Sequence, residues 1–122
     1  DYYEQLYTLS SSLFHRYELA TQQLHLGRTG ECQENLEEML ADPRVQEERI
    51  RVAWESGSAE VPLYAALFNL RGNLEKELNR TGTARKSLRA AYRAAPDYTL
   101  ARNNLRTLEA KEREERERRD DR

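Results

Sequence analysis

The chain has 122 residues, of which 38% are hydrophobic and 34% charged, with 5 glycines, 3 prolines and a formal net charge of −2. That length suits one compact domain, and so few glycines and prolines argue against a turn-rich β fold and favour helices. The near balance of 20 basic and 22 acidic residues predicts no face rich in one sign of charge. Nucleic acid is therefore not an expected partner.

The first predicted helix covers residues 1–26. Apolar side chains recur every three or four residues from Leu6 to Leu24, which is the spacing of one helical face. A tight turn is expected at Gly27, because glycine readily takes the left-handed conformation that ends a helix. A second helix follows over residues 31–41. It carries Cys32, for which core packing is expected and a reactive thiol at the helix start is the alternative.

A short third helix is predicted at residues 44–55. Asp42 and Pro43 before it are typical of a helix start, and Ser56-Gly57-Ser58 after it is typical of a helix end. The only tryptophan, Trp54, lies in this segment. Packing inside the protein and anchoring of an interface both remain open for it.

The strongest helical pattern covers residues 63–78, where leucines and alanines form a wide apolar stripe. A turn at residues 79–82 leads to a helix over 83–95, and Pro96-Asp97 ends that helix and caps the last one. From residue 111 the sequence alternates acidic and basic residues without an apolar stripe. We therefore divide the chain into a helical domain, 1–110, and a charged tail, 111–122, that is either helical or disordered.

Residues 65–98 resemble one tetratricopeptide repeat, a motif of 34 residues that folds as a pair of helices. The large, small and proline positions of that motif are occupied by Phe68, Gly72, Ala84, Leu88, Ala91 and Pro96. Residues 13–43 follow the same order more weakly, and the segment after Tyr98 is similar to a capping helix. The predicted fold is therefore all-α, with antiparallel helical hairpins forming a tetratricopeptide-like α-solenoid fragment that ends in a charged helix.

The resemblance implies a non-enzymatic scaffold or adaptor whose helical groove binds a peptide or helix of a partner protein. Transferred to this sequence, the groove residues are Phe14, Tyr17, Thr21, Asn69, Asn73, Lys76 and Asn103. Asn69 and Asn73 are expected to be exposed together and to contact the partner. The alternative is a structural subunit that forms homo- or hetero-oligomers through apolar helix faces, and membership of a longer repeat array also stays open.

Catalytic and metal chemistry have no support in the sequence, because no nucleophile elbow, phosphate-binding glycine loop or zinc motif is present. His15 and His25 would point to different faces of one helix, so they are not expected to share a metal. We predict no catalytic residue and no cofactor. A single cysteine favours the cytoplasm, and no apolar run approaches the ~20 residues that cross a bilayer, so no membrane insertion is expected.

Overall fold

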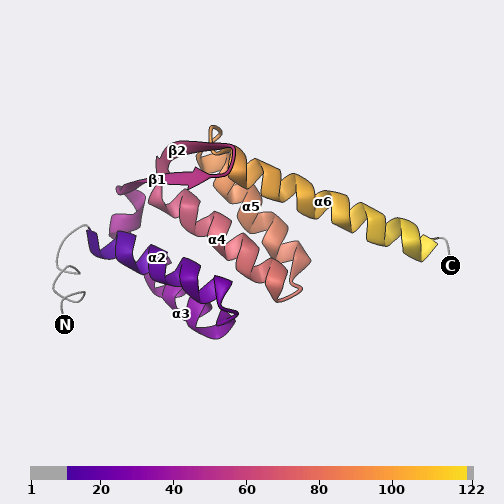
Figure 1. Cartoon of the computed structure of the whole chain (residues 1–122), viewed down its shortest axis with the longest axis horizontal. Helices are drawn as coiled ribbons and strands as arrows, with labels where there is room; N and C mark the ends of the chain where they lie inside the picture. Colours follow the sequence, from indigo (N-terminus) through magenta and orange to yellow (C-terminus); the bar gives the residue numbers. More distant parts are fainter. Residues whose placement is uncertain (1–10, 121–122) are drawn as a thin grey trace.

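The computed structural model describes residues 11–120 of the chain. Two helical hairpins and a final helix make up most of this range: α2 (Ser11–His25), α3 (Thr29–Leu40), α4 (Leu63–Glu77), α5 (Thr81–Ala94) and α6 (Thr99–Asp120). Figure 1 shows them in order, from the α2–α3 pair at one end to α6, whose last turns project past the other helices. The first ten residues of the predicted first helix lie outside the described part.

The two hairpins have matching positions along the chain. α2 begins at Ser11 and α4 at Leu63, which is 52 residues later, and both helices have 15 residues. α3 begins at Thr29 and α5 at Thr81, again 52 residues later. The weaker similarity predicted for the first hairpin thus corresponds to a helical pair with the same spacing as the second.

Both hairpins turn through a residue in the left-handed conformation. Gly27 has a φ of 77° and Asn79 a φ of 60°. In each turn the next amide donates to a carbonyl five residues earlier, so Arg28 bonds the Gln23 oxygen and the equivalent bond leaves Arg80, both at 2.8 Å. This bond pattern satisfies carbonyls at a helix end. The predicted glycine turn is confirmed, and asparagine takes the place of glycine in the second hairpin.

The second hairpin is closely packed where Gly72 of α4 meets Leu88 of α5. A Cβ atom added to Gly72 would lie 2.6 Å from Leu88 Cγ and 3.3 Å from the Ala84 oxygen. Both Ala84 and Leu88 are fully buried. Ala20 and Leu36, which precede Gly72 and Leu88 by 52 residues, are fully buried as well. A small residue at the helix contact, expected from the sequence, is therefore present in both hairpins.

The prediction of a helix at residues 44–55 was wrong. A 3-10 turn, η1 (Pro43–Gln46), is followed by an antiparallel hairpin of β1 (Arg49–Trp54) and β2 (Gly57–Pro62). Ile50 and Val61 pair across the two strands and are both buried against the helical core. The apolar residues of β1 alternate, which is the period of a strand with one buried face. The fold is therefore mostly helical, with a small sheet above one end of α4 (Figure 1).

α6 covers the open side of α5. Leu105 and Leu108 of α6 form a second small core with Ala84 and Leu88 of α5. The helix runs without a break through residue 110, where the tail was expected to begin, and Glu112 still contacts Arg85 of α5 at 3.4 Å. From residue 113 to 120 every side chain is exposed. The described part of the charged tail is thus a solvated continuation of α6.

Candidate functional site

Tyr98, in the turn before α6, is the point where four parts of the chain meet. Its side chain is fully buried, and its hydroxyl accepts a hydrogen bond of 3.3 Å from Asn69 Nδ2 of α4 and interacts with the Tyr17 side chain of α2. Asn104 of α6 donates to Asn69 Oδ1 at 3.0 Å. The ring of Trp54 in β1 lies 5.9 Å from that of Tyr98, centroid to centroid. These contacts tie α2, α4, α6 and the β-hairpin together.

Burial sets the acid–base behaviour of the two tyrosines. It raises the pKa of Tyr98, and the neighbouring Tyr17 raises that pKa further because two ionised hydroxyls would repel each other. Burial also raises the pKa of Tyr17. Both phenols therefore stay protonated at neutral pH, where they serve as hydrogen-bonding groups.

The expectation that Asn69 is exposed was wrong. Only 4% of its surface is accessible, and both its amide nitrogen and its amide oxygen are used in hydrogen bonds. Its partners Tyr98 and Asn104 come 29 and 35 residues later, so no local pattern around Asn69 reveals them. A buried amide is stable because both of its polar atoms are satisfied. Asn69 therefore joins α4 to α6 and offers no free group to a partner.

The other predicted groove residues remain accessible to different degrees. Phe14, Lys76 and Asn103 are exposed, whereas Tyr17, Thr21 and Asn73 are half-buried. Asn73 and Lys76 follow Asn69 on the same side of α4, since they lie four and seven residues beyond it. Asn103 precedes the bonded Asn104 on α6. The structure thus brings Asn73 and Asn103 to the two sides of the Asn69–Asn104 bridge.

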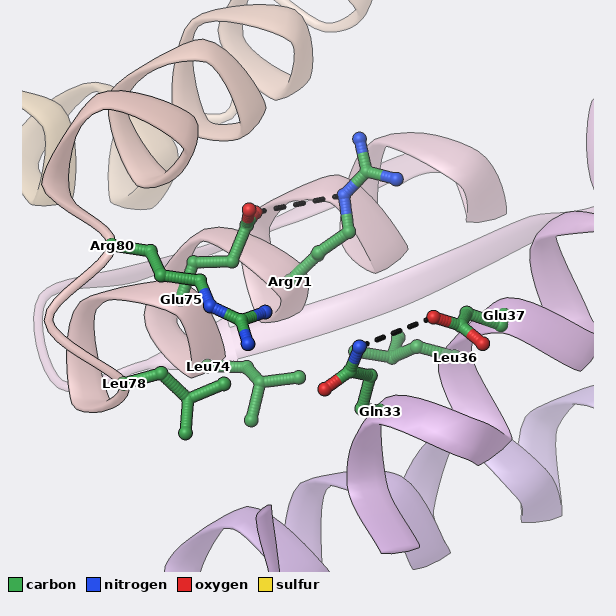
Figure 2. Close-up of a pocket in the computed structure, with 8 residues that line it drawn as sticks. All are labelled: Gln33, Leu36, Glu37, Arg71, Leu74, Glu75, Leu78 and Arg80. Carbon is green, nitrogen blue, oxygen red and sulfur yellow. Dashed lines mark hydrogen bonds and ion pairs between the residues drawn. The ribbon is translucent and has the colours of Figure 1, made fainter. Parts of the chain in front are cut away.

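A cavity of about 210 Å³ lies on the other side of α4, facing α3 (Figure 2). It is lined by Gln33, Leu36, Glu37, Arg71, Leu74, Glu75, Leu78 and Arg80. Ligand pockets usually measure roughly 300–1,000 Å³. The cavity is smaller than that, so a drug-sized molecule would not be enclosed.

The charged side chains at this cavity bond one another. Arg71 Nε donates to Ser87 Oγ of α5 at 3.1 Å and lies 3.7 Å from Glu75 Oε1, to which Ser87 donates at 2.6 Å. The guanidinium of Arg71 also lies 4.9 Å from the ring centre of Phe68. Arg71 and Glu75 stand where the tetratricopeptide motif usually has apolar residues. Their mutual contacts explain how charged groups are accommodated at those positions.

The remaining candidates have structural positions. Cys32 is fully buried and burial raises the pKa of its thiol, so the core-packing prediction is confirmed and a reactive thiolate is disfavoured. Trp54 is half-buried and packs against Tyr98, which confirms a packing role for it. His25 is exposed at the end of α2.

Within residues 11–120, no three His, Cys, Asp or Glu side chains are grouped so that they could hold a metal ion. No helix in the same range has the length and apolar character needed to cross a membrane. Comparison with protein-family models, with curated proteins and with solved structures gives no match. The tetratricopeptide resemblance stays a prediction, and the function has to be argued from the surface.

Proposed function

We propose that this protein is a non-enzymatic interaction module that holds an extended or helical peptide of a partner protein along α4 and α6. The observation that carries the proposal is the Asn69–Asn104 bridge, which fixes the two helices and leaves Asn73 and Asn103 accessible on either side. An asparagine side chain offers a donor and an acceptor, as a peptide backbone does. Two such groups suit the recognition of a main chain with little dependence on its sequence.

The tetratricopeptide interpretation supports the same surface. Two hairpins with equal spacing, a small residue at each helix contact and a left-handed turn in each are features expected of that repeat. In the resembling family the first helix of each hairpin lines the groove. Here those helices are α2, α4 and the capping helix α6, which carry all seven predicted groove residues. A single buried cysteine fits a reducing compartment, so the proposal places the protein in the cytoplasm.

The test is a peptide library displayed on phage and selected on the folded chain, followed by calorimetry with the peptides obtained. Asn73→Ala combined with Asn103→Ala should weaken binding by at least about tenfold while changing the free energy of unfolding by less than ~0.5 kcal/mol. Gln46→Ala with Ser58→Ala, two exposed residues between the hairpins, is the control and should bind normally. Undiminished binding by the folded asparagine variant would refute the proposed groove.

A second candidate is a structural subunit that associates through apolar side chains of α2. Phe14, Leu19 and Leu26 are 42%, 46% and 66% exposed, and Leu19 and Leu26 lie seven residues apart on one face. Contiguous exposed apolar groups commonly mark contact surfaces. Leu19→Gln with Leu26→Gln should then abolish an association that persists at high salt. Light scattering that gives the same mass for the variant and the wild type would exclude this candidate.

A further inference from the structure

Helices α3 and α5 lie on the same side of α4, opposite the proposed peptide surface. Arg71 of α4 shows this arrangement, because it lines a cavity with Gln33 and Leu36 of α3 and also bonds Ser87 of α5. Figure 2 shows Arg71 and Glu75 of α4 facing α3 across that cavity. The outer faces of α3 and α5 are therefore neighbours, and the two helices run in the same direction (Figure 1).

The outer faces of these two helices have opposite charges. α3 contains four glutamates and no lysine or arginine, and α5 contains three arginines and one lysine and no acidic residue. On α3 the exposed carboxylates are those of Glu31, Glu34, Glu37 and Glu38, and on α5 the exposed cations are those of Lys86, Arg89 and Arg93. The expectation that no face is rich in one sign of charge was therefore wrong. The two excesses cancel in the whole chain and appear only when each helix is considered alone.

The charges also occupy equivalent positions in the two hairpins. Glu34 and Lys86 are 52 residues apart, and so are Glu37 and Arg89. In residues 11–120 neither Lys86 nor Arg89 has a carboxylate within ion-pair distance, and neither Glu34 nor Glu37 has a cation. Glu37 accepts only a neutral hydrogen bond, from Gln33 at 3.2 Å. Two matched sets of uncompensated charge thus lie side by side on one face.

We propose that this face binds a second copy of the chain, with α3 of each copy against α5 of the other. A two-fold axis that runs along the groove between the two helices exchanges their places and preserves their direction. Glu34 and Glu37 of one copy then face Lys86 and Arg89 of its partner, and the same contacts form twice. Two-fold contacts require a surface that complements itself, and an acidic strip beside a basic strip at equal heights meets that condition.

An external acidic partner, such as a nucleic acid, would use only α5 and would leave the matching carboxylates of α3 unexplained. The two-fold pair uses both strips, which is why the observations favour it. Exposed ion pairs are individually weak and screened by salt. The dimer should therefore be a low-affinity one whose dissociation constant rises at least about tenfold between ~50 mM and ~500 mM salt. The inference does not depend on the peptide groove, which lies on the opposite layer.

The experiment is analytical ultracentrifugation of the full chain and of two charge-reversed variants. Glu34→Lys with Glu37→Lys makes both strips basic, and Lys86→Glu with Arg89→Glu makes both acidic. Each variant alone should be monomeric under conditions where the wild type dimerises. An equimolar mixture of the two variants should form a heterodimer, because every contact is then between opposite charges. Circular dichroism on each variant confirms that it is folded.

A control with the same change in charge is Glu114→Lys with Glu117→Lys, in the exposed end of α6, and it should dimerise like the wild type. A wild type that stays monomeric at low salt and high protein concentration would overturn the proposal. So would a mixture of the two variants that does not associate, or an association that strengthens with salt, which would indicate apolar contacts. Binding of a short DNA duplex by the monomeric wild type would instead assign α5 to an acidic partner.

Discussion

Replacing Gly72 by alanine should destabilise the protein, although alanine is the better helix former. In an exposed helix this change gains up to about 1 kcal/mol. Here the new methyl group would lie 2.6 Å from Leu88 Cγ and 2.7 Å from Leu88 Cδ2, well inside van der Waals contact. Leu88 is fully buried and the Ala84 oxygen lies 3.3 Å from the same point, so neither side can easily move away.

Overpacking of a core costs roughly 1–3 kcal/mol. Set against the gain in helix propensity, the expected loss of unfolding free energy is about 1–2 kcal/mol, or a fall in Tm of roughly 3–8 °C for a chain of this size. Urea denaturation followed by circular dichroism measures it. Gly82→Ala is the control, because nothing lies within 4 Å of its added Cβ, and it should be neutral or stabilising.

Leu88→Val tests whether the contact with Leu88 is the cause. Shortening that side chain should cost less in the Gly72→Ala background than in the wild type, because it makes room for the new methyl group. A Gly72→Ala variant as stable as the wild type, or additive effects of the two changes, would refute close helix contact at this point.

Three further outcomes are expected. Because the pKa values of Tyr17 and Tyr98 are raised in the folded state, their contribution to stability is fully present below the unfolded value of 10.0 and is lost as pH rises above it. The alkaline loss of stability should be smaller in Tyr98→Phe, as measured by urea midpoints from pH 8 to 11. Cys32 should react with a thiol reagent only as fast as the protein opens, and a rapid reaction of the native protein would contradict its burial. Deleting residues 113–122 should lower the helical circular dichroism signal but shift Tm by no more than ~2 °C, because residues 113–120 are exposed and the Arg85–Glu112 contact is kept; a larger fall would assign the tail a packing role.

Local patterns in the sequence were sufficient for the helices. The predicted range 63–78 is α4 within one residue, and 83–95 agrees with α5 within two. Apolar residues at three- and four-residue spacing decide such segments, because a helix of this kind must bury one continuous stripe. The small residue at Gly72 could also be predicted, since its need depends on a neighbouring helix in the same hairpin.

The β-hairpin shows where the reading of local pattern failed. Ile50, Val52 and Trp54 alternate, as strand residues do, but Val45, Val52 and Ala53 also fit a short helix. In so short a segment the two periods can hardly be told apart. What decides between them is the cross-strand pairing of Ile50 with Val61, which depends on residues outside the segment. Packing on α4, and not local preference, therefore selects the strand.

The polar site could be predicted only in part, for a different reason. The periodicity of α4 correctly put Asn69 and Asn73 near one another, yet it could not show that Tyr98 and Asn104 cover one and leave the other accessible. Burial of a polar residue depends on whether distant groups satisfy it. Asn69→Ala should accordingly leave the Asn104 amide without its partner, at a cost of about 1–3 kcal/mol.

The same reasoning separates what the two hairpins share from what distinguishes them. Ala20 and Gly72, and likewise Cys32 and Ala84, are small buried residues at equivalent positions. These positions determine how closely two helices can approach, so a large residue at any of them would alter the shape of the hairpin. The outer positions carry no such constraint, because exposed side chains contribute little to stability. A reversal of charge between equivalent outer positions of α3 and α5 therefore costs the fold almost nothing, and it leaves the choice of partner as the property that those positions control.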